Sequence, residues 1–95
     1  MPSYLVETYL ARRCAGERAV REERARSAAE ELTRVRFEHS IHVPEDEMCF
    51  FVFDAPSRRD AALAARRAGL DPIRVVKALS SCTPITDNAN GEEQR

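Results

Sequence analysis

The sequence predicts an α+β domain of βαββαβ order, with two helices on one face of a four-stranded antiparallel sheet. The chain has 95 residues, of which 43% are apolar, and this suffices for one hydrophobic core. Stretches with a two-residue apolar alternation and stretches rich in alanine, glutamate and arginine follow one another in that order. Two similar βαβ halves in succession are the pattern of the ferredoxin-like fold.

The first strand and the first helix are predicted over residues 3–10 and 16–34. In SYLVETYL apolar residues alternate between two faces, and Glu7 is the carboxylate among them. Residues 16–34 are mostly good helix formers, and their apolar stripe is largely alanine. A helix with such small side chains packs close to its sheet. We therefore expect the large core residues to come from the strands.

The second strand is predicted over residues 35–43, which contain both histidines. Simple alternation places His39 beside Phe37 on the face toward the helices, and Glu38 and His42 on the opposite, open face of the sheet. By the same alternation, Ile41 lies on the face toward the helices and Ser40 on the open face. Two histidines three residues apart on a strand point to opposite faces, so both can ligate one ion only if a bulge intervenes.

In the second half of the chain, the residue pattern predicts a turn, a buried strand and another helix. Residues 44–47, PEDE, are typical of a solvated turn. Residues 48–54 are apolar on both faces, which requires cover on both faces. Ser57 and Asp60 have the spacing of a capping box at a helix start. Gly69 indicates the end of that helix.

The fourth strand is predicted over residues 73–79, IRVVKAL. After Ser80 the composition becomes polar and ends in NANGEEQR. We therefore expect one ferredoxin-like domain over residues 1–80 and a polar, mobile tail over residues 81–95.

The open face of the predicted sheet needs a partner. Both helices cover one face, which leaves the other bare in a monomer, yet the third strand is apolar on that side as well. A second copy of the chain is the simplest cover. The sequence therefore predicts a homodimer through the open sheet face, in the form of a dimeric α+β barrel.

Charge and composition argue against several classes of partner. The net charge is −1, and basic residues alternate with acidic ones, as in ERAVREERAR, so we expect no nucleic-acid partner. The sequence has no run of about 18 apolar residues, so we expect no membrane partner. Its three cysteines are widely spaced, which indicates reduced thiols and a cytoplasmic protein.

Four polar side chains form the candidate ligand-binding site: Glu7, Tyr9, Glu38 and His42. On the predicted open face they would line a partly polar cavity between two sheets. Glu7, Glu38 and His42 offer oxygen and nitrogen ligands for a divalent metal ion. Each also has a plainer interpretation. Glu7 can pair with a basic side chain such as Lys77, Tyr9 can pack, and His42 can be a solvated edge residue.

Three segments resemble a known family: YLVETYL over residues 4–10, VRFEHSIHVPEDEMCFFVFDAPS over residues 35–57, and AARRAGLDPIRVVKAL over residues 64–79. They are similar to small nickel-binding ferredoxin-like proteins common in actinobacteria, a family with a domain-of-unknown-function label. The resemblance covers about Tyr4 to Leu79. It implies the ferredoxin-like fold, a dimer, and nickel or another divalent metal as the cofactor.

The resemblance also implies a divergent member of that family. Nickel-binding members have a histidine where this chain has Tyr9 and a cysteine where it has Phe51. They have histidines in the second helix, where this chain has Arg66 and Arg67. The chain thus resembles a relative that lacks the usual metal-site histidines and cysteine.

These observations predict a non-enzymatic dimeric binding protein that holds a metal ion or small ligand at the open sheet face. Two alternatives remain open. The first is a small cofactor-free α+β-barrel enzyme of the monooxygenase or isomerase type, with His42 or His39 as the base and Glu7 or Tyr9 as its partner. It requires an enclosed cavity that an imidazole reaches. The second is a structural or interaction module without a ligand, which a dry, fully packed dimer interface would favour.

Overall fold

The computed structural model describes residues 1–79, and its order of elements is the predicted βαββαβ. The strands are β1 (Ser3–Tyr9), β2 (Arg36–Val43), β3 (Met48–Asp54) and β4 (Arg74–Ala78). The helices are α1 (Glu17–Glu31) and α2 (Arg58–Arg67), and two short 3₁₀ turns are η1 (Arg12–Cys14) and η2 (Pro44–Asp46). The predicted tail, residues 81–95, lies outside the described residues.

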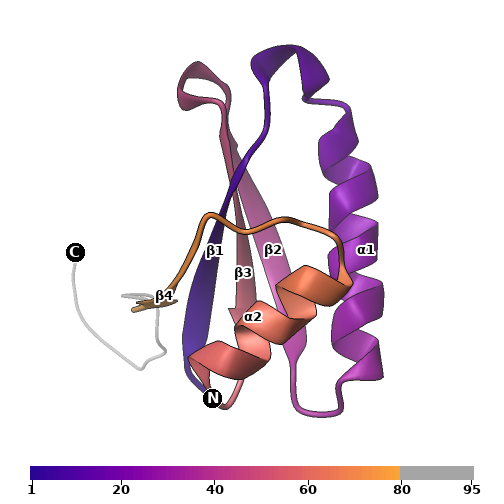
Figure 1. Cartoon of the computed structure of the whole chain (residues 1–95), viewed down its shortest axis with the longest axis vertical. Helices are drawn as coiled ribbons and strands as arrows, with labels where there is room; N and C mark the ends of the chain where they lie inside the picture. Colours follow the sequence, from indigo (N-terminus) through magenta and orange to yellow (C-terminus); the bar gives the residue numbers. More distant parts are fainter. Residues whose placement is uncertain (80–95) are drawn as a thin grey trace, which may run out of the picture.

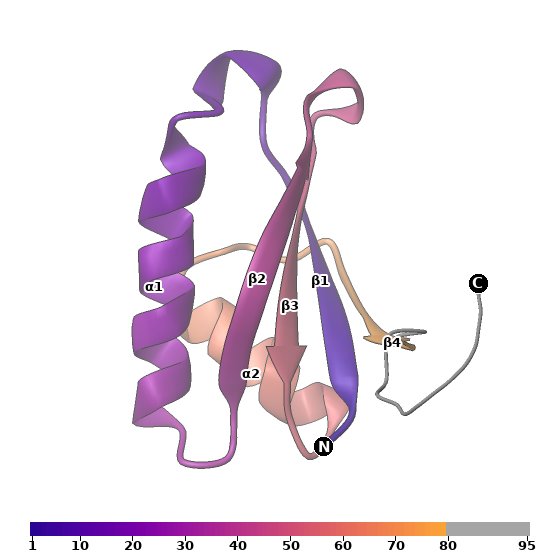
Figure 2. The ribbon, with the colours of Figure 1, turned by 180° about the vertical axis from the view of Figure 1, so that it is seen from behind.

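The four strands form one antiparallel sheet in the order β2-β3-β1-β4. The first and third strands are therefore central, and the fold is the ferredoxin-like one predicted. Both helices cover the same face. In Figure 1 α2 crosses in front of the strands, and in Figure 2, seen from behind, the strands lie in front of α2. Neither helix within residues 1–79 is both long and apolar enough to cross a bilayer.

The core lies between the sheet and the two helices. The strands supply its large side chains, including Phe37, Phe51 and Phe53, whose rings pack at centroid distances of 6.2 and 5.5 Å from Phe37. The helices supply alanines: Ala25, Ala28 and Ala29 from α1, and Ala61, Ala64 and Ala65 from α2. The prediction that the strands carry the core volume is confirmed.

The helix ends follow local signals, with one difference from prediction. The Ser57 hydroxyl accepts a hydrogen bond from the Asp60 amide at 3.2 Å and donates one to the Asp60 carboxylate at 2.9 Å, which caps α2. Gly69 follows α2 with a φ of 72°. Helix α1 ends three residues before the predicted Arg34, because Leu32 turns to an extended backbone and packs its side chain against the core.

A β-bulge at Glu38 changes the facing of the rest of β2. Phe37 pairs with Phe53 and His39 pairs with Val52, so β2 uses two residues where β3 uses one. Beyond the bulge, Ser40 and His42 pair with the buried Phe51 and Cys49 on the helix side, whereas His39 and Ile41 lie on the open face. The predicted facing of these four residues is therefore wrong, although the two histidines do lie on opposite faces.

Hydrogen bonds from α1 hold β2 in this register. Arg18 Nε donates to the Ser40 hydroxyl at 2.9 Å, and Arg18 Nη2 donates to the Ser40 carbonyl at 3.2 Å. The Ser40 hydroxyl donates in turn to the Glu22 carboxylate. Ser40 is 6% exposed, so these bonds satisfy a polar side chain that the bulge has turned inward.

Phe51→Asp is expected to abolish folding. The Phe51 side chain is fully buried between the sheet and the helices, and an unpartnered carboxylate there costs several kcal/mol. A small domain has a total stability of about 5–15 kcal/mol. Thermal unfolding followed by circular dichroism should show no cooperative transition. Val20→Asp, at an exposed position of α1, is the matched control and should melt like the wild type. Wild-type melting of the Phe51 variant would contradict the assignment of this core.

Candidate functional site

The open face of the sheet is apolar at its centre. Side chains of alternate residues point away from the helices, and the apolar ones at the centre of the face are Leu5, Ile41, Phe50, Val52 and Val76. Ile41 is 45% exposed, and the other four are half-buried. Contiguous apolar surface of this kind is typical of a site that contacts a partner or a ligand.

A hollow of about 530 Å³ opens on this face, where β1 begins and β3 ends. We call it the open-face hollow. Its lining residues are Ser3, Leu5, Glu38, His39, Ile41, Val52, Asp54, Ala78 and Leu79. It combines apolar walls with a few polar groups, which is the usual composition of a small-molecule site.

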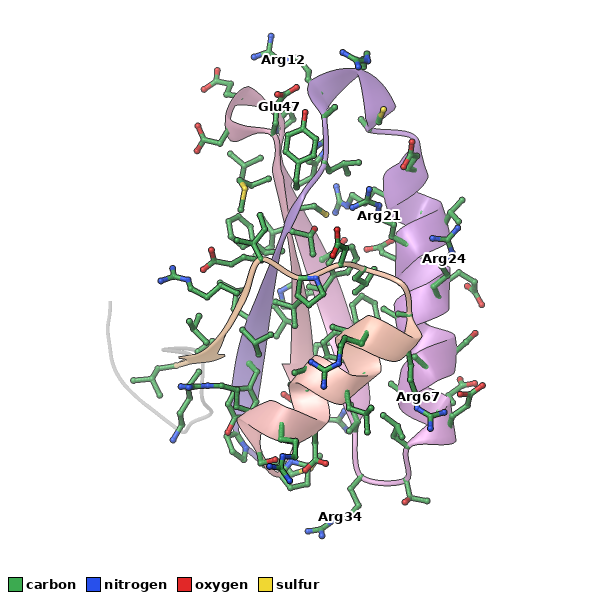
Figure 3. All side chains as sticks on the ribbon, viewed as in Figure 1. Arg12, Arg21, Arg24, Arg34, Glu47 and Arg67 are labelled. Atoms are coloured by element: carbon green, nitrogen blue, oxygen red, sulfur yellow. The ribbon has the colours of Figure 1, made fainter. Side chains whose placement is uncertain are left out.

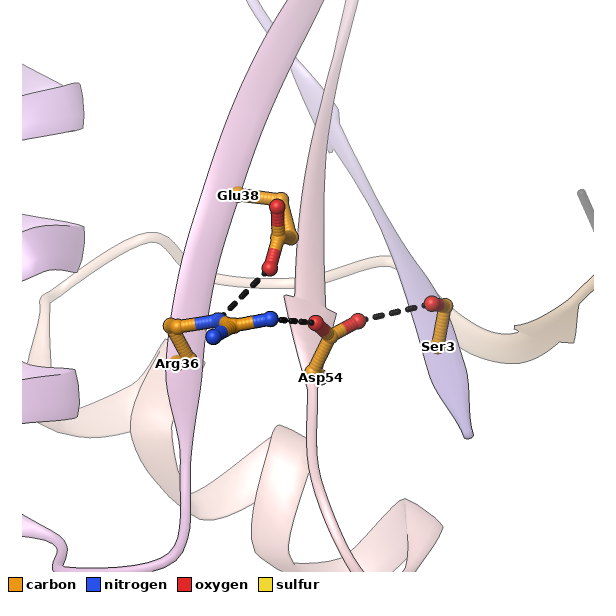
Figure 4. Close-up of polar contacts among 4 residues, drawn as sticks. All are labelled: Ser3, Arg36, Glu38 and Asp54. Atoms are coloured by element: carbon orange, nitrogen blue, oxygen red, sulfur yellow. Dashed lines mark hydrogen bonds and ion pairs between the residues drawn. The ribbon is translucent and has the colours of Figure 1, made fainter. Parts of the chain in front are cut away.

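A hydrogen-bond network forms the polar end of the hollow (Figure 4). Arg36 Nε donates to Glu38 Oε2 at 2.8 Å, and Arg36 Nη2 donates to Asp54 Oδ2 at 3.1 Å. The Ser3 hydroxyl donates to Asp54 Oδ1 at 2.7 Å. The register explains the arrangement, because Asp54 is the cross-strand partner of both Ser3 and Arg36. The Arg36 guanidinium thus donates hydrogen bonds to two carboxylates, those of Glu38 and Asp54.

The Asp54 carboxyl is held in its charged form. Burial by itself raises its pKa, but a side-chain interaction with Glu38, the hydrogen bonds from Ser3 and Arg36, and the positive charge of Arg36 outweigh burial, so the pKa lies below its ordinary value. The bulge is needed for this network, since it places Arg36 opposite Asp54. At neutral pH the polar end of the hollow therefore presents charge to a ligand.

Glu7 lies on the open face but is already paired. Its carboxylate accepts hydrogen bonds from Arg74 Nε at 3.1 Å and Arg74 Nη2 at 2.8 Å. Arg74 is its cross-strand partner on β4. The plainer interpretation of Glu7 as an ion-pair member is confirmed, but the partner is Arg74 rather than Lys77. Lys77 is instead paired in register with Tyr4, whose side chain is buried on the helix side.

Tyr9 lies at the far end of the sheet from the hollow. Its hydroxyl donates to Glu47 Oε1 at 3.3 Å, and Glu47 Oε2 accepts the backbone N–H of Arg12 at 2.9 Å. The Leu10 N–H also donates to the Glu47 carbonyl at 2.9 Å. Figure 3 shows Arg12 and Glu47 side by side there. Tyr9 therefore belongs to a group of hydrogen bonds that joins the end of β1 to the β2–β3 turn, which we call the Glu47 lock.

His42 lies on the helix side of the sheet, and its Nε2 atom is buried without a hydrogen-bond partner among residues 1–79. It cannot reach the open face with Glu7 and Glu38. Those two carboxylates are themselves two strands apart, which separates them by at least about 10 Å. Within the described chain, no group of three or more histidine, cysteine, aspartate or glutamate side chains could hold a metal ion. A single chain thus does not bring the three predicted metal ligands together.

The sequence-based candidate site omitted four residues that lie in the polar end of the hollow or beside it: Ser3, Arg36, His39 and Asp54. The sequence does contain one indication of the Arg36–Asp54 pair, because opposite charges near the two ends of a hairpin favour a cross-strand pair. Counting back from the turn without a bulge, however, pairs Asp54 with Phe37. Only the extra residue at Glu38 brings Arg36 opposite Asp54. The same bulge brings His39 into the hollow.

A second groove, of about 420 Å³, lies between the two helices. Its apolar floor includes Ala28 and Ala68, and Arg67 pairs with Glu31 across its edge at 3.4 Å. Both charged side chains are more than half exposed, so the pair contributes little binding energy in water. The open-face hollow is the stronger candidate, because its Asp54 side chain is only 13% exposed.

Comparisons with known proteins support the fold alone. No family model and no curated protein matches the sequence. Among solved structures, the chain is similar to the SCO4226 protein of Streptomyces coelicolor A3(2), with a TM-score of 0.67 and 18% identity over 83% of this chain and 99% of that one. At this identity the likeness shows a shared ferredoxin-like architecture. The resemblance to nickel-binding proteins stays a prediction.

Glu47→Gln is expected to weaken the acid dependence of stability. The backbone N–H of Arg12 lowers the pKa of Glu47 below its ordinary 4.5, and this outweighs the effect of desolvation. A lowered pKa stabilises the fold above the unfolded-state pKa, and the contribution is lost as the pH falls through and below about 4.5. Urea unfolding at pH 7 and pH 3 should therefore show a smaller loss for the variant than for the wild type.

The matched control for that experiment is Glu45→Gln, at an exposed position of the same turn. It should keep the wild-type loss of stability between pH 7 and pH 3. Equal losses in the Glu47 variant and the wild type would show that the Glu47 lock does not stabilise the fold.

Proposed function

We propose that the protein is a non-enzymatic binding protein that dimerises through its open sheet face and holds a small ligand or metal ion there. The observation that carries the proposal is the open-face hollow, in which apolar walls meet the Arg36, Glu38 and Asp54 network. In one chain the hollow is open to solvent. A second copy over the same face would enclose it and exclude water.

The apolar centre of the open face supports the dimer. Phe50 and Val52 of the central strand β3, together with Leu5 of β1, are only half-buried in one chain. Covering them removes apolar surface from water, which is the main favourable term in association. The Glu7–Arg74 pair at the β1–β4 edge can be desolvated as a neutral unit. A two-fold arrangement would place the same apolar centre on both copies.

His39 favours a second candidate function, the small cofactor-free α+β-barrel enzyme. Its side chain lines the open-face hollow, as a base in that class of enzyme must. Glu38 and Asp54 line the same hollow and replace Glu7 and Tyr9 as candidate partners of the base. A crystal structure of the dimer tests both functions against the ligand-free module. An enclosed cavity that the His39 side chain reaches would be consistent with the enzyme. A dry, fully packed interface would exclude both the ligand-binding site and the active site.

Phe50→Asp is expected to break the dimer and leave the fold intact. The side chain lies on the open face, so the new carboxylate is hydrated in the monomer and buried unpaired in the dimer. By symmetry each interface contains the change twice, and we expect the dimer Kd to rise by roughly two orders of magnitude or more. Light scattering should give twice the chain mass of 10.7 kDa for the wild type and for Val20→Asp. A Phe50 variant that stays dimeric would place the interface elsewhere.

The metal form of the proposal is tested by calorimetric titration with nickel, cobalt and zinc. One chain lacks a three-ligand group within residues 1–79, so the proposed site combines side chains of both copies. Binding should then be lost in the monomeric Phe50→Asp variant. Absence of wild-type binding tighter than about 100 μM, a weak affinity for a specific metal site, would exclude the metal form.

A further inference from the structure

We infer that the open-face hollow selects an organic cation, an amine with an apolar body, rather than a metal ion or an anion. The inference rests on the proposed function, because it names the class of ligand that the same site would take. It follows from the balance of charge on the open face, from which groups line the hollow, and from the size of the hollow.

Among residues 1–79, the carboxylates and guanidiniums on the open face do not balance. The strands place three carboxylates there, from Glu7, Glu38 and Asp54, and two guanidiniums, from Arg36 and Arg74. The Glu7–Arg74 pair is neutral, so the network around Asp54 has a net charge of −1. Closing the face removes this charge from water, which is costly unless a positive charge enters with it.

The negative groups, and not the positive one, face the hollow. Glu38 and Asp54 line it, whereas Arg36 does not. A ligand in the hollow therefore meets two carboxylates, the Ser3 hydroxyl and the His39 imidazole. An ammonium group suits them, because it brings a positive charge and three hydrogen-bond donors.

The remaining walls argue for an organic body on that cation. Leu5, Ile41 and Val52 face the same hollow, and apolar walls do not ligate an ion. The volume of about 530 Å³ is that of a small-molecule site, not of an ion cage. Within residues 1–79 no group of three potential ligands is assembled for a metal. Charge at one end and apolar walls at the other thus match an amphiphilic amine.

The test compares four probes by calorimetric titration of the full chain at pH 7: n-hexylamine, n-hexanol, hexanoate and nickel. The three organic probes share one apolar body and differ in charge. We expect hexylammonium to bind at least tenfold more tightly than hexanol, and hexanoate and nickel to bind more weakly still. Equal affinity for the three organic probes, preference for hexanoate, or tighter binding of nickel would each overturn the inference.

Variants of the two carboxylates test the physical cause. Asp54→Asn and Glu38→Gln should each reduce hexylammonium affinity about tenfold and leave hexanol affinity unchanged, with Glu30→Gln on exposed α1 as the control that changes neither. If Asp54→Asn fails to fold by circular dichroism, Glu38→Gln alone decides. Unchanged hexylammonium affinity in the folded variants would overturn the inference.

The two levels of proposal fail in different ways. A wild-type chain that is monomeric by light scattering and binds none of the four probes overturns both the proposed function and this inference. A dimer that binds hexanol and hexylammonium equally overturns only the choice of a cation and keeps the binding site.

Discussion

The β-bulge at Glu38 decides which side chains of β2 lie on the open face of the sheet. It turns Ser40 and His42 toward the helices and His39 and Ile41 away from them. Its register is held from outside the strand, because Arg18 and Glu22 of α1 hydrogen-bond the buried Ser40 hydroxyl. A bulge thus re-aims a strand's side chains, as bulges near functional sites commonly do. Without it, Arg36 would not lie opposite Asp54 and the hollow would lose its polar end.

The rest of the fold gives this strand a rigid support. Alanines on both helices let α1 and α2 pack closely on the sheet, and the phenylalanines of β2 and β3 fill the space between them. Two locks close the ends of the central strands. Glu47 bonds to Tyr9, Leu10 and Arg12 at one end, and Ser3 bonds to Asp54 at the other. Ser3 and Asp54 also line the hollow, so the same residues belong to this lock and to the candidate site.

The open face is the side of the sheet that neither helix of a single chain covers. Its centre is apolar, its β1–β4 edge has a neutral ion pair, and its hollow has an excess of negative charge. These three properties have different consequences. The apolar centre favours a second copy, the neutral pair permits burial, and the unbalanced carboxylates favour a positively charged ligand. The proposals for dimer and ligand follow from this division of the face.

Short-range patterns in the sequence determined the order of elements, the alanine-lined helices and the cap at Ser57. Each depends on neighbours a few residues apart, which a sequence displays directly. The site was found only in part. Glu38 was correctly placed at the open face, but Glu7 and Tyr9 are occupied by Arg74 and Glu47, and His42 faces the helices.

Only the tertiary structure decided the register beyond Glu38. The residues that fix it, Arg18 and Glu22, are 16 or more positions away along the chain and act through side-chain hydrogen bonds. Because side chains alternate with a period of two, one extra residue exchanges the two faces for every position that follows.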